Sequence, residues 1–433
     1  MAISYSSSLK FLYGLQKHGI KLGLETITGM MARLGKPQHR YHTLHIGGTN
    51  GKGSTAAMTA AILRAAGYRV GLYTSPHLLD FRERIRVSDD PIPEDCVAEL
   101  TERLQDAAGV SLRPTFFEFT TALALQFFAD SQVEIAVLEV GMGGRFDATN
   151  VVVPLVSTIT NVALDHEEYL GHTVAAIAFE KAGIIKRDVP VVAGRLDPEA
   201  VGVIERIASE QAAPLFRLNV DFQAEGTIRE RFRYQGFHWS YANLSSPLDG
   251  AHQLDNAACA LALLELAAAE GIRVSEESVR VGLRSVIWEG RLEVVDHHPT
   301  FLLDGAHNPA AAEVVAAHLA AYRRGHPDSR ILLVIGMMRD KDRDGFFRAI
   351  LPTVDEVIVT QANMARAATV EELCGSLGEQ SDSAHVAPHP ADALALARRL
   401  ASPEDLICVT GSLMLVGEVK ALLRGCGLSP IRG

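Results

Sequence analysis

A glycine-rich segment near the start of the chain carries the residues with the clearest chemical character. Residues 45–55 read HIGGTNGKGST, with Lys52 between two glycines and two hydroxyl residues directly after them. In the usual P-loop pattern, G-x-x-x-x-G-K-[ST], the hydroxyl residue follows the lysine. Here Gly53 follows the lysine, the hydroxyl moves to Ser54, and Ile46 stands where the pattern has its first glycine. The segment is therefore a broken P-loop, a chance glycine turn, or another family's version of the motif.

The sequence around this loop favours phosphate binding. A strand is expected over 41–46 and an alanine-rich helix over 54–67, so backbone N–H groups gather at a helix N-terminus, where phosphates bind. Lys52 would reach the terminal phosphates, and Ser54 or Thr55 could ligate Mg²⁺. A glycine-rich turn without a ligand is the plain alternative, but a lysine between two glycines at such a junction is rare by chance. We expect nucleotide binding. This prediction identifies a phosphate-containing ligand but not the reaction.

Polar side chains close three further predicted strands in the same half of the chain. They are Ser75 at the end of 68–75, Glu139 near the end of 133–140, and Asp165 and His166 after 154–164. In an open parallel sheet, ligands bind beyond the carboxyl ends of the strands. Oxygen ligands with one imidazole suit Mg²⁺ or Mn²⁺ held together with substrate phosphates. Taken singly, each has a structural alternative: a turn for Ser75, a loop cap for Glu139, and a core or surface position for His166.

The second part of the chain repeats this arrangement. One expected strand ends in Asp304, and Ser412 stands at a later strand-to-helix turn. Asn308 has the character of a helix N-cap, which puts His307 beside a helix N-terminus. Arg291 would be free to swing its guanidinium over a phosphate. Each is a common turn residue, but together they predict a mobile domain that completes a site at the interface.

Apolar runs alternate with helical segments along the chain, which predicts an α/β fold with a parallel sheet covered on both faces. Helices are expected over 114–130, starting at Pro114, and over 256–272. The segment 214–250 has the composition of β-hairpins inserted in the first domain. We place the domain boundary at Glu289–Gly290, which gives domains 1–289 and 290–433.

The composition of the 433 residues limits the classes of partner. Hydrophobic residues make up 48%, charged residues 21%, and the formal net charge is −11 with no Lys/Arg-rich run, so we expect no nucleic-acid partner. Local basic groups such as Arg82, Arg84 and Arg86, which alternate as on one face of a strand, could still attract anions. Five scattered cysteines predict no disulfide framework or zinc site. Without a signal peptide or an apolar span of about 18 residues, we expect no membrane partner and a cytoplasmic location.

Taken together, these motifs resemble the Mur ligase superfamily, specifically folylpolyglutamate synthases and bifunctional dihydrofolate synthases. The resemblance follows the family's order through nearly the whole chain: GIKLGLETI, GGTNGKGST, GLYTSPHLLDFRERIRV, FFEFTT, LEVGMGGRFDATN, TNVALDHEEYLGHT, EKAGIIK, HQLDNAACALALL, GRLEVV, LDGAHNP, IGMMRDKD and VTGS. The phosphate loop of this family reads GTNGKGS, so the late hydroxyl belongs to its own version of the motif. The implied fold is an N-terminal P-loop ATPase-type domain with a parallel-rich sheet and a smaller Rossmann-like α/β C-terminal domain, with ATP between them.

The resemblance implies roles for individual residues. It assigns ATP binding to Gly48, Thr49, Asn50, Gly51, Lys52, Gly53, Ser54, Thr55, Asn256, Arg291 and Asp304. It places two magnesium ions at Ser75, Glu139, His166 and Lys181, with Ser54 added from the loop, and Lys181 matches a carbamylated lysine in relatives. It puts Phe117, Asp147 and Ala148 in the pterin-side pocket, and His307 and Ser412 near ATP or the incoming glutamate. Lys52, His166, Lys181 and Arg291 would be catalytic. By its sequence context alone, Lys181 would be a solvated helical charge.

The implied reaction uses ATP to join a carboxylate to the amine of L-glutamate, with dihydropteroate or reduced folates as acceptors. The segment GGRFDATN follows the pattern of the bifunctional enzymes, with Phe146 where leucine is common. The alternatives are polyglutamylation alone, a cell-wall Mur ligase, and a P-loop switch protein. Only about 46 residues precede the loop, too few for a UDP-binding domain of about 100 residues. A switch protein would need no second-domain site and no glutamate. We expect a monomer.

Overall fold

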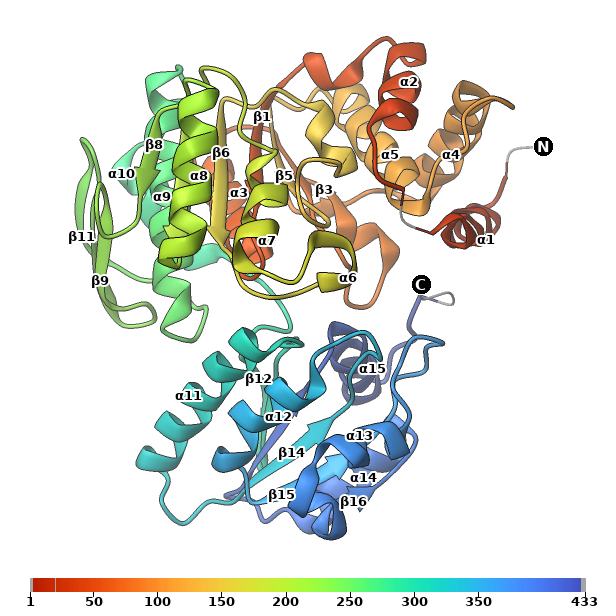
Figure 1. The fold of residues 1–433 in the computed structure, drawn as a ribbon, viewed down its shortest axis with the longest axis vertical. Helices are drawn as coiled ribbons and strands as arrows, with labels where there is room; N and C mark the ends of the chain where they lie inside the picture. Colours follow the sequence, from red (N-terminus) through yellow and green to blue (C-terminus); the bar gives the residue numbers. More distant parts are fainter. Residues whose placement is uncertain (1–2, 20, 430–433) are drawn as a thin grey trace.

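The computed structural model describes residues 3–19 and 21–429, and its two α/β units face each other in Figure 1. The larger unit contains an eight-stranded sheet in the order β4-β3-β2-β5-β1-β6-β7-β8. Its strands are β1 (His42–Gly47), β2 (Val70–Tyr73), β3 (Ile85–Val87), β4 (Asp90–Pro91), β5 (Ile135–Glu139), β6 (Val156–Asn161), β7 (Val191–Arg195) and β8 (Leu215–Arg217). The run from β2 to β8 is parallel, and β3 and β4 add an antiparallel hairpin at one edge.

Helices cover both faces of this sheet because its central strands are apolar on both sides. In β5, Ile135 and Val137 join one buried cluster, whereas Ala136 and Leu138 join another. The helices are α1 (Tyr5–Gly14), α2 (Glu25–Arg33), α3 (Lys52–Ala65), α4 (Glu94–Ala108), α5 (Phe116–Asp130), α6 (Glu167–Leu170), α7 (Val174–Ala182), α8 (Pro198–Glu210), α9 (His252–Ala269) and α10 (Glu276–Ser285). Four short 3₁₀ helices are η1 (Leu15–His18), η2 (Pro37–His39), η3 (Phe81–Arg84) and η4 (Ala148–Val151).

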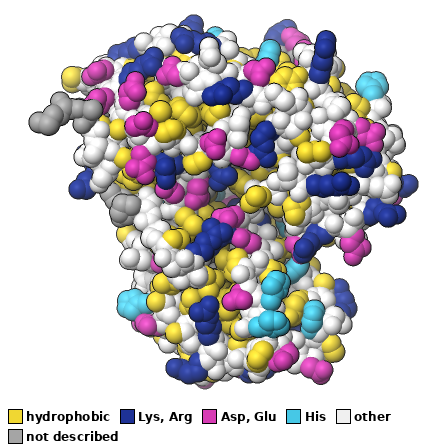
Figure 2. Space-filling model, turned by 180° about the vertical axis from the view of Figure 1, so that it is seen from behind, with side chains coloured by type: hydrophobic (Ala, Val, Ile, Leu, Met, Phe, Trp, Pro, Cys, Tyr) yellow, Lys and Arg dark blue, Asp and Glu magenta, His cyan; other side chains and the backbone are white. Residues whose placement is uncertain are grey.

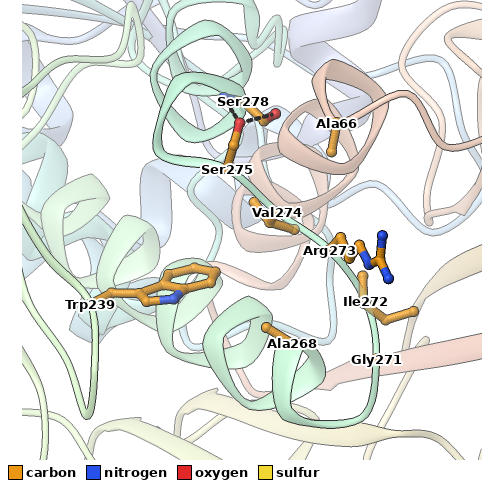
Figure 3. Close-up of a pocket in the computed structure, with 9 residues that line it drawn as sticks. All are labelled: Ala66, Trp239, Ala268, Gly271, Ile272, Arg273, Val274, Ser275 and Ser278. Atoms are coloured by element: carbon orange, nitrogen blue, oxygen red, sulfur yellow. Dashed lines mark hydrogen bonds between the residues drawn. The ribbon is translucent and has the colours of Figure 1, made fainter.

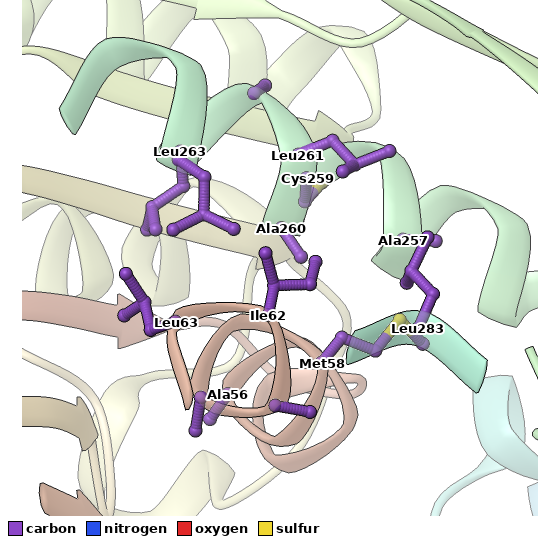
Figure 4. Packing of buried hydrophobic residues seen from close by; sticks show 14 of the residues in the cluster. Ala56, Met58, Ile62, Leu63, Ala257, Cys259, Ala260, Leu261, Leu263 and Leu283 are labelled. Carbon is purple, nitrogen blue, oxygen red and sulfur yellow. The ribbon is translucent and has the colours of Figure 1, made fainter. Parts of the chain in front are cut away.

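Alanine-rich helices pack closely beneath the phosphate loop. Small residues on α3 and α9 let the two helices approach each other, and Figure 4 shows Met58 and Ile62 of α3 near the side chains of α9 and Leu283 of α10. This packing fixes α3, and therefore the loop at its N-terminus. The expected β-hairpin segment is partly confirmed. Its first residues form edge strand β8, and the rest form a three-stranded antiparallel sheet of β9 (Gln223–Thr227), β10 (Arg231–Gln235) and β11 (Ser240–Leu244).

The smaller unit has a six-stranded sheet in the order β12-β13-β17-β14-β15-β16, in which only β12 runs antiparallel to its neighbour. Its strands are β12 (Glu293–His297), β13 (Thr300–Leu303), β14 (Ile331–Ile335), β15 (Glu356–Val359), β16 (His385–Val386) and β17 (Leu406–Thr410). Its helices are α11 (Pro309–Gly325), α12 (Arg343–Ile350), α13 (Val370–Ser376), α14 (Pro390–Leu400) and α15 (Leu413–Arg424), with 3₁₀ turns η5 (Leu351–Thr353) and η6 (Gly378–Ser383). The expected α/β fold with a smaller second unit is confirmed.

Two local expectations were wrong. Arg82 and Arg84 do not lie on a strand with Arg86, because Phe81–Arg84 form η3 under a capping box from Asp80. Helix α5 begins at Phe116 and not at Pro114, because the side chain of Thr115 caps it.

The distribution of surface charge and the apolar character of the helices concern the expectations about nucleic-acid and membrane partners. On the face shown in Figure 2, acidic and basic side chains are mixed and form no extended patch of one sign. Within residues 3–19 and 21–429, none of the helices combines the length and the apolar character that a membrane span requires.

Candidate active site between the two sheets

The strand order brings the predicted residues to one edge of the larger sheet. Strand β1 lies between β5 and β6, and β2 lies next to β5, so their four carboxyl ends are adjacent. The carboxyl edge of the smaller sheet faces them. Asn308, after β13, exchanges hydrogen bonds of 3.1 and 3.3 Å with Asn50 of the phosphate loop. Lys341, after β14, forms an ion pair of 2.7 Å with Asp165 beyond β6. A shared crevice between the units is therefore present.

The phosphate loop is held by the end of β6. The backbone N–H groups of Thr49 and Asn50 donate to the backbone oxygen and the side chain of Asn161, at 3.0 and 2.8 Å. Gly51, with a φ of 82°, precedes α3, so the helix starts at Lys52, two residues earlier than expected. Lys52 is consequently in the first helical turn, and its Nζ donates to the carbonyls of Gly48 and Thr49 at 3.0 and 2.9 Å.

The displaced hydroxyl of this loop has a steric cause. A Cβ atom at Gly53 would lie 2.6 Å from Cζ2 of Trp288, in the segment that links the two units. A serine or threonine directly after Lys52 would therefore collide with the indole ring. Ser54, one position later, avoids this contact, and its Oγ accepts a hydrogen bond of 3.2 Å from Gln253. Sequence reasoning missed Trp288 because its partner lies 235 residues away.

Asn256 lies directly behind the loop. Helix α9 begins at His252, one turn before the expected start, which places the buried Asn256 side chain against Gly51. Its Nδ2 donates to Gln253, which in turn reaches Ser54. Thr55 Oγ1 is buried and has no hydrogen-bond partner among the described residues. The loop thus has a polar support on its α9 side.

Glu139 lies at the centre of the charged groups. Its Oε2 accepts the backbone N–H of Ser75 at 3.0 Å. Burial raises the pKa of Glu139, and the nearby cations Lys52 and Arg291 act in the opposite direction. Burial lowers the pKa of Lys52, whereas Glu139 and Asp165 act to raise it. These groups therefore share one electrostatic environment and are not scattered over separate surfaces.

Lys181 is buried, contrary to its default interpretation as a solvated helical lysine. Its side chain is 3% exposed, and Nζ donates to the carbonyl of Gly48 at 2.9 Å. Burial first, and then the nearby Lys52, lower the pKa of Lys181 to about 7. Part of the population is therefore a neutral amine at neutral pH.

His166 and Asp165 meet the smaller unit directly. Asp165 lies within 3.5 Å of His307 Nε2 and 3.3 Å of Asn308 Nδ2, in addition to Lys341. Burial alone would raise the pKa of Asp165, but the hydrogen bond from His307 and the nearby His307, His166 and Lys341 side chains hold this pKa well below its usual range. Burial lowers the pKa of His166 to about 4, which leaves its imidazole neutral and able to bind a cation. Lys341 was missed because its motif gave no hint of a partner 176 residues away.

The residues matched to the pterin-side pocket form a group beside the end of β5. The ring of Phe117 packs over Gly141, where a Cβ atom would collide with it. Asp147 is buried and accepts hydrogen bonds from the backbone of Met142 and Thr149 at 2.9 and 3.0 Å. Ala148 follows it and is buried as well. The three predicted residues therefore lie together.

Three predicted residues of the smaller unit lie in the loops after its strands. Asp304 is buried, and its oxygens accept the backbone N–H groups of Leu292 and Ala306 at 2.8 and 2.7 Å, so it also fixes the linker beside Arg291. His307 Nδ1 lies 2.9 Å from the carbonyl of Gly305. Ser412 lies at the predicted strand-to-helix turn, where its side chain caps α15.

A cavity of about 250 Å³ opens between the two units next to these groups, and Gly53, Ser75, Glu139 and Arg291 line it. A larger, shallow depression of about 690 Å³ lies elsewhere on the first unit, where Trp239 faces the segment before α10 (Figure 3). Because none of the predicted residues line that depression, we place the chemistry in the interdomain cavity.

The residues at the crevice fit a magnesium ion that is shared with a nucleotide. No group of three or more His, Cys, Asp or Glu side chains in the described parts of the chain could hold a metal alone. One buried carboxylate, a neutral imidazole and hydroxyl groups beside a phosphate loop are instead the donor set of an ion that keeps phosphate or water ligands.

Comparison with known proteins identifies the class. Residues 46–264 match the Mur ligase middle domain, and residues 290–413 match the Mur ligase glutamate ligase domain. A phosphate-loop unit joined to a glutamate ligase unit defines a ligase of the Mur type.

The relatives narrow this class to one family. The chain is 33% identical to the dihydrofolate synthase/folylpolyglutamate synthase of Bacillus subtilis (strain 168), over 98% of the chain and 100% of the relative. The Escherichia coli (strain K12) protein of the same name is 37% identical, with 96% and 95% covered. The solved structure of E. coli FolC in complex with DHPP and ADP has a TM-score of 0.90 at 36% identity, over 98% of each chain. The chain belongs to the dihydrofolate synthase/folylpolyglutamate synthase family, which confirms the resemblance drawn from its motifs.

Proposed function

We propose that this chain is an ATP-dependent ligase that adds L-glutamate both to dihydropteroate and to reduced folates. The observation that carries the proposal is the meeting of two carboxyl edges, with Lys52, Glu139 and His166 on one side and His307 on the other. Two relatives support the choice of ligands. One is E. coli FolC with DHPP and ADP, and the other is a bifunctional folylpolyglutamate synthase/dihydrofolate synthase with Mn, AMPPNP and L-glutamate bound.

The chemistry requires activation of a carboxylate, which is a poor electrophile. A carboxylate oxygen of the acceptor attacks the γ-phosphorus of ATP, which gives an acyl phosphate and ADP. The amine of glutamate then attacks the acyl carbon, and the tetrahedral intermediate collapses to an amide and inorganic phosphate. No protein nucleophile is needed.

Cationic side chains offset the repulsion between an anionic carboxylate and an anionic phosphate. Lys52 and Arg291 both act on the buried Glu139 and would also lie beside the transferred phosphoryl group. Ser54, Ser75, Glu139, His166 and Lys181 would hold two Mg²⁺ ions, which supply further charge neutralisation of the phosphate oxygens. Contact between the two units would exclude water, which hydrolyses an acyl phosphate.

Lys181 would bind metal as a carbamate. A lysine must be neutral to react with CO₂, and burial lowers the pKa of Lys181 to about 7. The carbamate replaces a cation by an anion, which would suit a position beside metal ions and next to Lys52. The catalytic residues would then be Lys52, His166, Lys181 and Arg291.

The remaining predicted residues take binding roles. Gly48 to Thr55, Asn256, Arg291 and Asp304 would bind ATP, and Phe117, Asp147 and Ala148 would bind the pterin side of the acceptor. His307 and Ser412 would lie near ATP or the incoming glutamate. We assign the ATP-binding domain to 1–289 and the glutamate-ligase domain to 290–433, and we propose that the protein acts as a monomer.

The test supplies ATP, Mg²⁺ and L-glutamate with either dihydropteroate or tetrahydrofolate and measures phosphate release. We expect release with both acceptors. Release with tetrahydrofolate alone would restrict the activity to polyglutamylation, and release with neither would favour a nucleotide-driven switch. Lys52→Ala should abolish release while the protein stays folded, and release that persists would remove the phosphate-loop assignment.

A further inference from the structure

The proposed function, on which this inference rests, requires one phosphoryl site to accept carboxylates from two different acceptors. In dihydropteroate, the reacting carboxylate is attached to the benzoyl ring. In a reduced folate, a glutamyl residue follows that ring, and its γ-carboxylate reacts. The folate therefore brings an additional α-carboxylate close to the phosphoryl group, which dihydropteroate lacks. An enzyme that uses both acceptors needs space and a cation for that second carboxylate.

The interdomain cavity provides space at the required position. Gly53, Ser75 and Glu139 are among the residues that line it, so it adjoins the residues assigned to phosphate and metal. Trp288 and Leu413 line the cavity as well. Its volume of about 250 Å³ is below the range of about 300–1,000 Å³ that whole drug-sized ligands occupy. The cavity therefore suits part of an acceptor, such as one glutamyl residue.

Two guanidinium groups line this cavity without an acidic partner. In the described residues, no carboxylate lies within 4.0 Å of Arg86 or Arg291. Their hydrogen-bond acceptors are backbone carbonyls: Arg86 Nε donates to Glu83 at 3.3 Å, and Arg291 Nη1 donates to Gly290 at 3.0 Å.

The other charged side chains that line the cavity already have partners, and Glu139 accepts the backbone N–H of Ser75 at 3.0 Å. Arg424 is paired with Glu289 at 2.7 Å, and the carboxylate of Glu83 accepts the backbone N–H groups of Leu78, Leu79 and Asp80. Arg291 is assigned to ATP. Arg86, half-buried on β3, is therefore the guanidinium left to bind a further anion. A guanidinium recognises a carboxylate through two parallel N–H donors, which gives orientation as well as affinity.

We propose that Arg86 binds the α-carboxylate of the terminal glutamyl residue of folate acceptors. It thereby determines specificity, because it contributes to glutamate addition onto folates and not onto dihydropteroate. Among the described residues, the Arg86 side chain hydrogen-bonds only to the backbone of Glu83, and to no residue of the phosphate loop or the pterin-side group, so we expect the dihydropteroate reaction not to depend on it.

The test compares kcat/KM for tetrahydrofolate and for dihydropteroate in the wild type, Arg86→Gln and Arg86→Lys. Loss of a hydrogen-bonded carboxylate contact corresponds to about 10- to 100-fold, so Arg86→Gln should lower kcat/KM for tetrahydrofolate by that factor. The value for dihydropteroate should stay within about twofold. Arg86→Lys keeps the charge without the planar fork and should recover part of the loss. Arg82→Gln is the matched control, because Arg82 pairs with Asp80 at 3.0 Å and does not line the cavity.

Each other outcome contradicts the proposal. An equal loss for both acceptors would place Arg86 in a step common to both reactions. A rise in KM for L-glutamate with either acceptor would assign the carboxylate to the incoming amino acid. An unchanged Arg86→Gln enzyme would leave the guanidinium without this role. If the wild type released no phosphate with either acceptor, the proposed function itself would fail and this inference with it. Should the glutamine variant not fold, the same comparison of the two acceptors in Arg86→Lys decides.

Discussion

Restoring the common P-loop sequence in this protein should lower its stability and its activity. Gly53→Ser places a hydroxyl directly after Lys52, as most P-loops have it. In this fold the new Cβ would lie 2.6 Å from Trp288 Cζ2, 3.1 Å from Cε2 and 3.2 Å from Nε1. Overpacking of this kind costs about 1–3 kcal/mol. Movement of the indole ring could relieve this clash. Because Trp288 lies three residues before Arg291, that movement would also displace the linker and the guanidinium group of Arg291.

The assay combines the free energy of unfolding in urea with kcat/KM for ATP. We expect Gly53→Ser to lower the free energy of unfolding by about 1–3 kcal/mol. If the same energy is lost from the transition state at the ATP site, kcat/KM for ATP falls by about 5- to 150-fold. Gly202→Ser is the matched control, since Gly202 is also helical but its added Cβ would have no neighbour within 4 Å. There, serine should be neutral or stabilising by about 0.5 kcal/mol, because glycine is the poorer helix former.

A double-mutant cycle isolates the collision. In a Trp288→Ala background, the serine at position 53 should cost at least about 1 kcal/mol less, because the ring is absent. If Gly53→Ser were as stable and active as the wild type, or if its cost were unchanged without the indole, the steric explanation of this loop would be wrong.

Two further predictions concern buried lysines. Lys181→Ala should lose activity and regain part of it with short carboxylic acids such as acetate. Labelling of the wild type with ¹³C-bicarbonate should give a carbamate signal that rises from pH 6 to 8, because the neutral amine of Lys181 predominates above its pKa of about 7. No rescue of the variant, together with a pH-independent signal, would argue against a carbamate. Lys341→Met should lower the free energy of unfolding by about 1–3 kcal/mol, because it removes the nearest charge paired with Asp165 across the interface and leaves His307 and the amide of Asn308 there. An unchanged unfolding transition would mean that this ion pair does not hold the two units together.

Much of the sheet could be predicted because its strands have local signatures. The short apolar run that became β1 and the β-branched runs that became β5 and β6 indicated the crevice, since parallel neighbours end at one edge. Asn308 was recognisable as a helix cap, because capping depends on residues three or four positions away.

The contacts between the units could not be predicted in this way. Trp288 against Gly53 and Lys341 against Asp165 join residues more than 170 positions apart, and only the packing of both sheets brings them together. The burial of Lys181 had the same origin, since its acceptor, the carbonyl of Gly48, lies 133 residues earlier. The segment from Arg82 to Arg86 was predicted wrongly because, over only five residues, an alternating pattern of arginines is compatible with a strand and also with a short 3₁₀ turn.

The central claim is that opposed, cation-rich sheet edges let an acceptor carboxylate take the γ-phosphoryl group of ATP. It is tested most directly with dihydropteroate that carries ¹⁸O in both oxygens of its carboxylate, together with ATP, Mg²⁺ and L-glutamate. We predict that one ¹⁸O atom per turnover appears in the released inorganic phosphate, because the bond between the acyl carbon and that oxygen breaks when the amine attacks. Phosphate free of ¹⁸O would show that no acyl phosphate forms and would contradict the mechanism.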